Sequence, residues 1–213
     1  YAQNFDGLVL SFPKNKSISG EGIAHEGINS TKLGLKGIPT LAEELQIVRD
    51  LFLLEYTGGK LHIPTISSAK SVDLIKEAKK NGLQVSCSVA AHHLTLTDNE
   101  LHEFDSNFKT NPPLRTNTDC KALQKGVRTG VIDIITSDHD PIDIEYKKVE
   151  FSEAKDGTIG LESLFGAVNS VLPLEDFIKS ITSKPRAIFG LDSITIAEGK
   201  IAEISLFNPD DQY

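Results

Sequence analysis

Apolar and polar positions along the chain alternate between two periods. Short apolar runs of strand length occupy residues 8–12, 60–67, 84–90 and 131–137. Between these runs, helical patterns cover 41–52, 69–80 and 119–128. Strands that alternate with helices of ten or more residues are typical of right-handed βαβ units in a parallel sheet. We therefore predict an α/β fold whose functional residues gather at the carboxyl ends of the strands.

The first long helix has the clearest start signal. Thr40 and Glu43 have the spacing of a capping box, in which each residue caps the backbone of the other. Gly58 and Gly59 end this helix. Its apolar face consists of Leu41, Leu45, Val48 and Phe52. A second capping box, at 97–100, predicts a short helix.

The last third of the chain changes character. Residues 161–172 and 174–183 have helical patterns and are separated by Pro173. Residues 193–197 and 201–207 read as short strands on either side of a Glu198-Gly199 turn. This tail is therefore expected to form a hairpin on a small separate sheet.

Composition excludes several classes of function. The net charge is −8 and the isoelectric point is near 5.3, so a nucleic-acid surface, which needs a basic face, is not expected. Apolar runs stay well below the roughly 20 residues of a membrane span, which argues against membrane insertion. Two cysteines, Cys87 and Cys120, fit a reducing, cytoplasmic setting. The sequence contains no methionine, so Tyr1 is not expected to be a translation start.

Four βα units are too few to close a (β/α)8 barrel. They can form a small open sheet that binds a small molecule, or the second half of a barrel. Several stretches bear on this choice. They read "HEGINSTKLGLKGIPTLAEELQIVRDL", "SCSVAAHHLTLTDNELHEFDSNFKTNPPLR", "KALQKGVRTGVIDIITSDHDP" and "GTIGLES".

These stretches resemble the corresponding parts of dihydroorotases, in the cyclic amidohydrolase superfamily, in order and spacing. The resemblance covers essentially the whole chain but only the second part of a family member. It implies that 1–190 form half of a TIM-type metallo-dependent hydrolase barrel and that 191–213 belong to a small C-terminal β segment. The missing N-terminal half of the barrel, with the family's first His-x-His motif, is then an expected partner.

The resemblance also implies a site. The family uses one or two zinc ions to polarise an amide carbonyl and to activate the attacking water. Asp138 matches the aspartate that binds metal and shuttles the proton, so it is the expected catalytic and metal residue. Asn111 matches a substrate-contacting asparagine, and Asp156-Gly157 falls where backbone groups hold the substrate ring.

Three histidines that the resemblance requires are absent. Ser11 or Phe12 stands at a zinc-ligand position, Thr65 stands at a second, and Ile142 replaces a histidine that contacts substrate. Neutral threonine is a weak zinc ligand. His62 lies three residues before Thr65, so it faces the other side of the strand and does not substitute. The metal site is therefore expected to be degenerate, with zinc absent or weakly bound and Asp138 vestigial.

The other chemical residues have simpler interpretations. His92-His93 is expected to be scaffold, His139 a packed core histidine, and His25 and His102 solvent-facing. Cys87 lies mid-strand and is expected to be buried packing. Lys147-Lys148 is expected to be a solvated charge pair.

The leading hypothesis is a dihydroorotase-like protein of pyrimidine biosynthesis without its own hydrolase activity, kept for a structural or assembly role. Aspartate transcarbamoylase or further copies of the chain are the partners that the resemblance suggests. An active zinc-dependent dihydroorotase or related amidohydrolase that uses Asp138 is the second hypothesis. A generic small-molecule-binding α/β domain is the third.

Overall fold

A four-stranded parallel sheet organises the chain. The computed structural model describes residues 1–202 and 204–210. The sheet contains β1 (Leu8–Leu10), β4 (Lys60–Ile63), β5 (Val85–Ala90) and β6 (Ile134–Thr136), in that order, and all neighbouring pairs are parallel. The strands of this sheet lie side by side in the order in which they occur in the sequence, as successive βα units require. The predicted α/β fold with a parallel sheet is confirmed.

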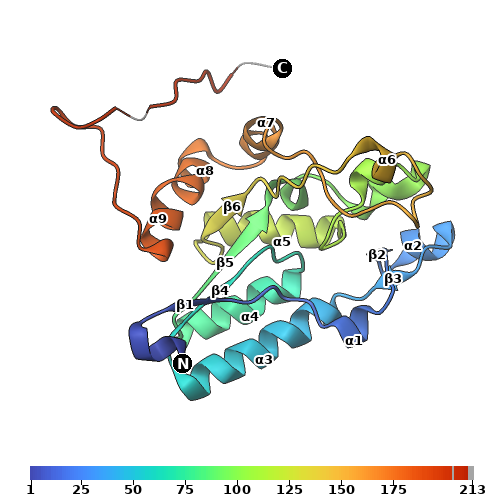
Figure 1. Ribbon diagram of the computed structural model, residues 1–213, viewed down its shortest axis with the longest axis horizontal. Helices are drawn as coiled ribbons and strands as arrows, with labels where there is room; N and C mark the ends of the chain where they lie inside the picture. The colour runs from blue at the N-terminus through green and yellow to red at the C-terminus, as the bar shows by residue number, and fades with distance from the viewer. Residues whose placement is uncertain (203, 211–213) are drawn as a thin grey trace.

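Three long helices connect these strands. They are α3 (Leu41–Thr57), α4 (Ala69–Lys80) and α5 (Asn117–Arg128) (Figure 1). The predicted ranges agree closely, because each helix has a local end signal. Ser68 caps α4 by accepting from the Ser71 amide, and Thr116 and Asp119 form a capping box at the start of α5. α3 ends at Gly58, whose φ of 71° favours glycine.

The core lies between the sheet and these helices. Alternate residues of β4 and β5 point into it: Leu61, Ile63, Val85, Cys87 and Val89 are buried there. Ile47 of α3, Ile75 of α4 and Leu123 of α5 meet them from the helix side. Phe177 is fully buried in the same cluster and comes from α8 (Leu174–Ile181), so this helix packs against the β6 end of the sheet.

The remaining elements are short. The α-helices are α1 (Lys16–Ser19), α2 (Ile28–Leu33), α6 (Ile144–Lys147), α7 (Leu164–Asn169), α8 (Leu174–Ile181) and α9 (Ser183–Phe189). Short 3₁₀ helices cover Ala2–Phe5, Ala91–Leu94, Asp98–Glu103 and Ser106–Phe108. A separate two-stranded parallel sheet pairs β2 (Ala24–His25) with β3 (Gly37–Ile38). The helix predicted after 97–100 is therefore a 3₁₀ helix, and Thr97 makes no side-chain cap.

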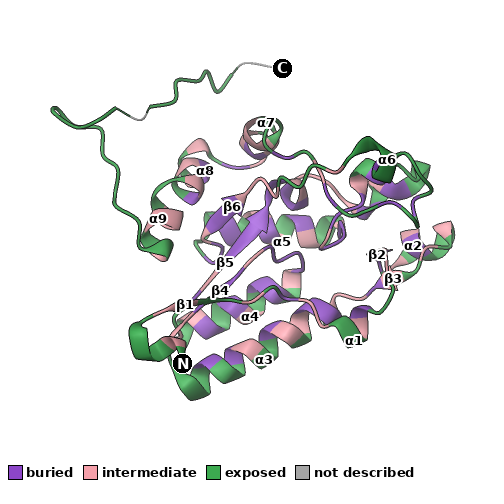
Figure 2. Ribbon diagram, viewed as in Figure 1, coloured by how far each residue is buried: buried purple, intermediate pink, exposed green. Residues whose placement is uncertain are grey.

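Two expectations about α3 are wrong. Thr40 makes no side-chain cap, since its own backbone is already helical, with φ of −58° and ψ of −28°, and Glu43 turns inward to bond Ser67 and Ser68 before α4. The predicted apolar face of Leu41, Leu45, Val48 and Phe52 is exposed, and the core contacts come from Ile47, Leu51 and Leu54 instead. Figure 2 shows exposed positions along the length of α3. Local periodicity finds the helix but does not identify the side on which the sheet lies.

The tail departs from its expected structure. In 191–202 and 204–210 the structure contains no strand, so the strands expected at 193–197 and 201–207 are absent from the described part of the tail. The tail extends away from the body of the chain (Figure 1). An isolated two-stranded hairpin is marginal in water without a further strand or helix to pack on. Among the described residues, no helix is both long and apolar enough to cross a membrane.

Candidate functional site at the carboxyl ends of the strands

The expected site residues lie where their strands end. Asp138 follows β6 by two residues, and Thr65 follows β4 by two residues. Both adopt left-handed backbone conformations, with φ of 48° at Asp138 and 50° at Thr65. Aspartate tolerates this region, but a β-branched residue is strained in it. The chain therefore keeps a sharp turn at each strand end, although a threonine occupies one of them.

Asp138 lies beside His92. Its Oδ2 is 3.9 Å from Nε2 of His92, and the Asp138 side chain is 35% exposed. Burial, and then the charge of Asp140, raise the pKa of Asp138, whereas burial lowers the pKa of His92 to about 4. His92 is therefore neutral near pH 7, and the contact is not an ion pair. Nε2 of His92 and Nδ1 of His93 are buried without a hydrogen-bond partner.

Ser11 and Thr65, which stand where the resemblance calls for histidines, make hydrogen bonds within the chain. Ser11 donates from Oγ to Oδ2 of Asp50 at 2.6 Å, so its hydroxyl points toward α3. Thr65 is buried, and its backbone N–H donates to Oγ of Ser88 at 3.1 Å. His62, as expected, belongs elsewhere: Nδ1 lies 2.8 Å from Oγ of Ser86, and its ring contacts Phe189.

Asn111 lies at the edge of an open cleft. Lys14 donates from Nζ to Oδ1 of Asn111 at 3.1 Å, which links the end of β1 to the loop before α5. Phe12, Lys14, Lys16 and Asn111 line a cleft of about 560 Å³ with Ser19, Gly20 and Glu21. The Asn111 amide is thus held in place by a lysine.

Gly157 is brought next to the strand ends. Its N–H donates to the carbonyl of Lys109 at 3.0 Å, two residues before Asn111. A Cβ at Gly157 would lie 2.6 Å from the Asp140 carbonyl and 2.7 Å from Ile142, and its φ of 136° also favours glycine. Asp156 is exposed beside it. Gly157 therefore lies against Asp140 and Ile142, and its N–H bonds the segment that leads to Asn111.

Two buried lysines bond backbone carbonyls of the loop before Gly157, and the sequence did not predict either interaction. Lys109 donates from Nζ to the carbonyls of Phe151, Ser152 and Ala154 at 2.6–3.0 Å. Lys147 was expected to be solvated, but it is buried and donates to the carbonyls of Ser106 and Lys155. Burial lowers the pKa of each ammonium. Carbonyl acceptors supplied by a distant loop leave no local sequence pattern.

A buried ionic network lies behind the site. The Glu43 carboxylate accepts from the amides of Ser67 and Ser68 at 2.8 and 3.1 Å, from the hydroxyls of Ser67 and Ser71, and faces Arg115 Nη2 at 3.8 Å. Arg115 donates to the Ile38 carbonyl at 2.9 Å. The network thus ties α3, the start of α4 and β3 to the loop that carries Asn111.

Two histidine expectations are wrong. His25 was expected at the surface, but it is buried, with Nδ1 3.1 Å from Arg115 Nη1. His139 was expected in the core, but it is exposed and accepts from the Gly160 N–H at 3.2 Å. His93 is buried as scaffold and Cys87 is fully buried, as expected, with burial raising the pKa of that thiol to about 12.

The strand-end side chains of this chain do not form a zinc site by themselves. Across 1–202 and 204–210, no three His, Cys, Asp or Glu side chains converge in a way that could hold a metal ion. Asp138 offers one carboxylate, while Thr65 and Ile142 offer a neutral hydroxyl and a hydrocarbon. Zinc sites in proteins need three or four strong donors.

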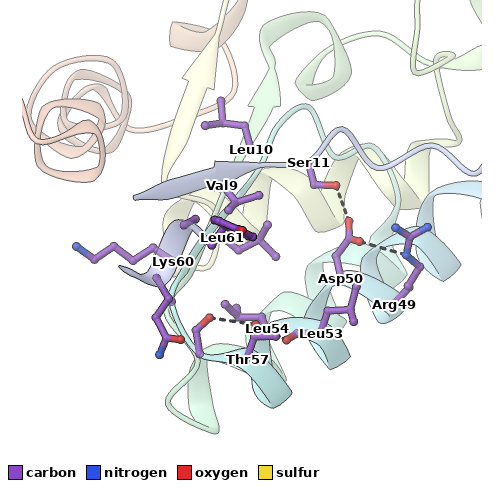
Figure 3. Close-up of a pocket in the computed structure, with 15 residues that line it drawn as sticks. Val9, Leu10, Ser11, Arg49, Asp50, Leu53, Leu54, Thr57, Lys60 and Leu61 are labelled. Atoms are coloured by element: carbon purple, nitrogen blue, oxygen red, sulfur yellow. Dashed lines mark hydrogen bonds and ion pairs between the residues drawn. The ribbon is translucent and has the colours of Figure 1, made fainter. Parts of the chain in front are cut away.

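A smaller but more apolar opening lies beside β1, at the edge of the sheet. A cavity of about 380 Å³ runs beside β1 and is lined by Val9, Leu10, Leu53 and Leu61, among others (Figure 3). Val9 and Leu10 are 45% and 57% exposed. β1 is an edge strand of the described sheet, and an apolar edge of this kind requires a cover.

Comparisons with known proteins give a consistent result. No family model matches the chain. It is 42% identical over 217 residues to a dihydroorotase of Pelotomaculum thermopropionicum, covering 99% of this chain and 51% of the relative. It is 40% identical over 214 residues to a dihydroorotase of Pelobacter propionicus, covering 98% and 50%. The chain thus spans about half the length of the curated relatives it matches.

Solved structures agree on the fold. A D-hydantoinase (dihydropyrimidinase) from a Thermus species superposes with a TM-score of 0.78 at 21% identity, covering 94% of this chain and 48% of that one. The L-hydantoinase of Arthrobacter aurescens gives 0.74 at 22% identity, covering 88% and 44%. The chain therefore has the architecture of half a TIM-barrel amidohydrolase.

Proposed function

Because the chain belongs to the dihydroorotase family and corresponds to the C-terminal half of its relatives, we propose that it forms half of a dihydroorotase-like barrel that has lost zinc-dependent ring hydrolysis. Its role is then structural, as a scaffold or assembly partner in pyrimidine biosynthesis. The observation that carries this proposal is the donor chemistry at the strand ends.

The donor chemistry supports loss of hydrolysis because three independent positions lack an imidazole. The positions lie after β1, after β4 and after β6, on separate loops, so a shift of a single loop does not restore them. Ser11 is engaged with Asp50, Thr65 is a weak neutral donor, and Ile142 has no donor. Asp138 alone supplies too few ligands for a second metal.

The barrel that we propose is completed by a preceding half. Residues 1–190 then make the second half of the barrel, and 191–213 join a small β segment. The open edge of β1 and the cavity beside it support this assignment, since another strand and helix fit an apolar sheet edge. Aspartate transcarbamoylase is the further partner that we propose for the assembly.

The complete protein that contains this chain provides the test. Carbamoyl-aspartate cyclisation and zinc content are measured on the same purified sample, with an active dihydroorotase as the positive control. We expect no turnover above background, and zinc well below one ion per chain. Zinc at one or more ions per chain together with turnover would refute the proposal.

A second candidate is an active amidohydrolase that uses Asp138. It is favoured by the raised pKa of that half-buried carboxyl beside neutral His92, an arrangement suited to accepting a proton. This candidate predicts turnover that Asp138→Asn abolishes while Asp140→Asn preserves most of it. Absence of turnover in the unsubstituted protein removes the candidate.

A further inference from the structure

The small second sheet has an apolar cluster of its own. The β2–β3 module, defined as residues 22–38, contains β2, α2 and β3 and lies to one side of the four-stranded sheet (Figure 1). Apolar side chains of the module pack in a cluster separate from the main core, whose buried members are Ala24, Leu101 and Phe151. Because a cluster of this size buries little apolar surface, polar contacts have a larger share in holding the module to the rest of the chain.

Arg115 makes the central polar contact to the module. Its Nη1 donates to the Ile38 carbonyl of β3 at 2.9 Å and lies 3.1 Å from Nδ1 of His25 in β2. Its Nε donates to Oγ of Ser67 at 3.0 Å, and its Nη2 faces Glu43 of α3. A single buried side chain therefore joins both strands of the module to the strand-end loops.

The bond between Arg115 and His25 exists in only one protonation state of the imidazole. A guanidinium has donors and no acceptor, so Nδ1 of His25 must accept, and the ring must be neutral with its proton on Nε2. A proton on Nδ1 would set one N–H against another across 3.1 Å, at a ring that is 7% exposed. A buried imidazolium beside a guanidinium is therefore incompatible with the closed contact.

The other charged groups around His25 do not remove this conflict. They are three carboxylates, which belong to Asp98, Asp119 and Glu26 and favour the protonated ring. Burial, and then the charge of Arg115, outweigh them and lower the pKa of His25 from its ordinary value of 6.5. Because the folded-state pKa is lowered, the contact keeps its full stability above pH 6.5 and loses it as the pH falls toward the folded-state value.

Release of the module would reach the cleft beside Asn111. Glu21 lines this cleft immediately before the module, and Asn111 lines it four residues before Arg115. Two parts of the cleft lining are thus continuous with the two sides of the contact between Arg115 and His25.

We propose that Arg115 and His25 form an acid-sensitive latch, which holds the β2–β3 module closed near neutral pH and releases it in mildly acidic conditions. This inference is independent of whether the protein hydrolyses cyclic amides.

Hydrogen exchange of the complete protein, followed by mass spectrometry at pH 7.5 and 5.0 and corrected for intrinsic exchange rates, tests the latch. We expect opening of peptides within 22–38 to become more than about fivefold more frequent at pH 5.0. The upper limit is about 30-fold, for an imidazole that titrates at 6.5 only in the open module. Peptides from α4 and β5 should stay protected at both pH values, which shows that the rest of the sheet remains folded.

His25→Gln separates the latch from a general effect of acid. The glutamine amide oxygen can accept from Arg115 Nη1 and does not titrate, so opening of this variant should change by less than about twofold. His102→Gln, at a side chain that is 71% exposed, is the matched control and should keep the natural response. A natural response below about fivefold, or an equal response in His25→Gln, would overturn the proposal.

The tautomer of His25 gives a second test that needs no folded variant. Nitrogen chemical shifts of the complete protein, labelled with ¹⁵N at histidine, report which ring nitrogen carries the proton. We expect Nε2 of His25 to be protonated and Nδ1 to be without a proton at pH 7.5. A proton on Nδ1 at that pH would overturn the acceptor role of His25, and with it the latch.

Discussion

The buried pair of Glu43 and Arg115 should be strongly coupled. Their side chains are 2% and 3% exposed, with 3.8 Å between Oε2 and Nη2. Glu43→Gln keeps the shape of the carboxylate but leaves the guanidinium without a counter-charge. Arg115→Met keeps most of the side-chain length but leaves the carboxylate alone, and it removes the donor to the Ile38 carbonyl.

The expected magnitudes follow from burial. Removing one partner of a buried ion pair destabilises a protein by about 3–5 kcal/mol, since an uncompensated charge remains. Because the double variant Glu43→Gln/Arg115→Met has no unpaired charge, its loss should fall below the sum of the single losses by about 2–3 kcal/mol. Ser71→Ala, which removes one hydroxyl donor to Oε1 at 2.6 Å, should cost about 1–2 kcal/mol.

Urea denaturation of the complete protein, with melting temperatures as a second measure, supplies the free energies of unfolding. Glu55→Gln, on the exposed side of α3, is the matched control and should change stability by less than about 0.5 kcal/mol. Single losses below about 1 kcal/mol, or strictly additive losses in the double variant, would refute the view that this network holds the strand-end loops together.

Two further predictions concern single residues at the strand ends. Burial lowers the folded-state pKa of His92 from 6.5 to about 4, so its contribution to stability is complete above pH 6.5 and is lost as the pH falls toward 4, by up to about 3 kcal/mol. His92→Gln should therefore weaken the pH dependence of the urea midpoint between pH 7 and 4.5. An unchanged pH dependence in this variant would contradict the prediction. Thr65→Asn should raise the free energy of unfolding by about 1 kcal/mol in the same assay, because asparagine accepts a φ near 50° better than a β-branched residue. A lower urea midpoint would mean that lost packing outweighs the relief of backbone strain.

The secondary structure of the barrel half could be predicted because its signals are local. The capping box of Thr116 and Asp119, the cap at Ser68 and the glycine at 58 all lie within a few residues of the helix ends they define. The placement of Asp138 and Thr65 at strand ends follows in the same way. Parallel strands bring their carboxyl ends to one rim whatever the intervening sequence.

The errors arose where distant partners decide the outcome. Glu43 was assigned to a cap, although its partners lie at Ser67, Ser71 and Arg115, which are 24 to 72 positions later in the chain. Lys147 was assigned to solvent, although carbonyls of two other loop residues bind its ammonium. The face of α3 was misjudged because periodicity identifies an apolar row but not which side of the helix the sheet occupies, and the sheet meets Ile47, Leu51 and Leu54.

Zinc analysis of the complete protein, with cyclisation of carbamoyl-aspartate followed in the same sample, tests the central claim most directly. The account predicts zinc well below one ion per chain and no turnover above background, because Thr65 and Ile142 cannot replace imidazoles around Asp138. Zinc bound at one or more ions per chain, with turnover that Asp138→Asn abolishes, would contradict it.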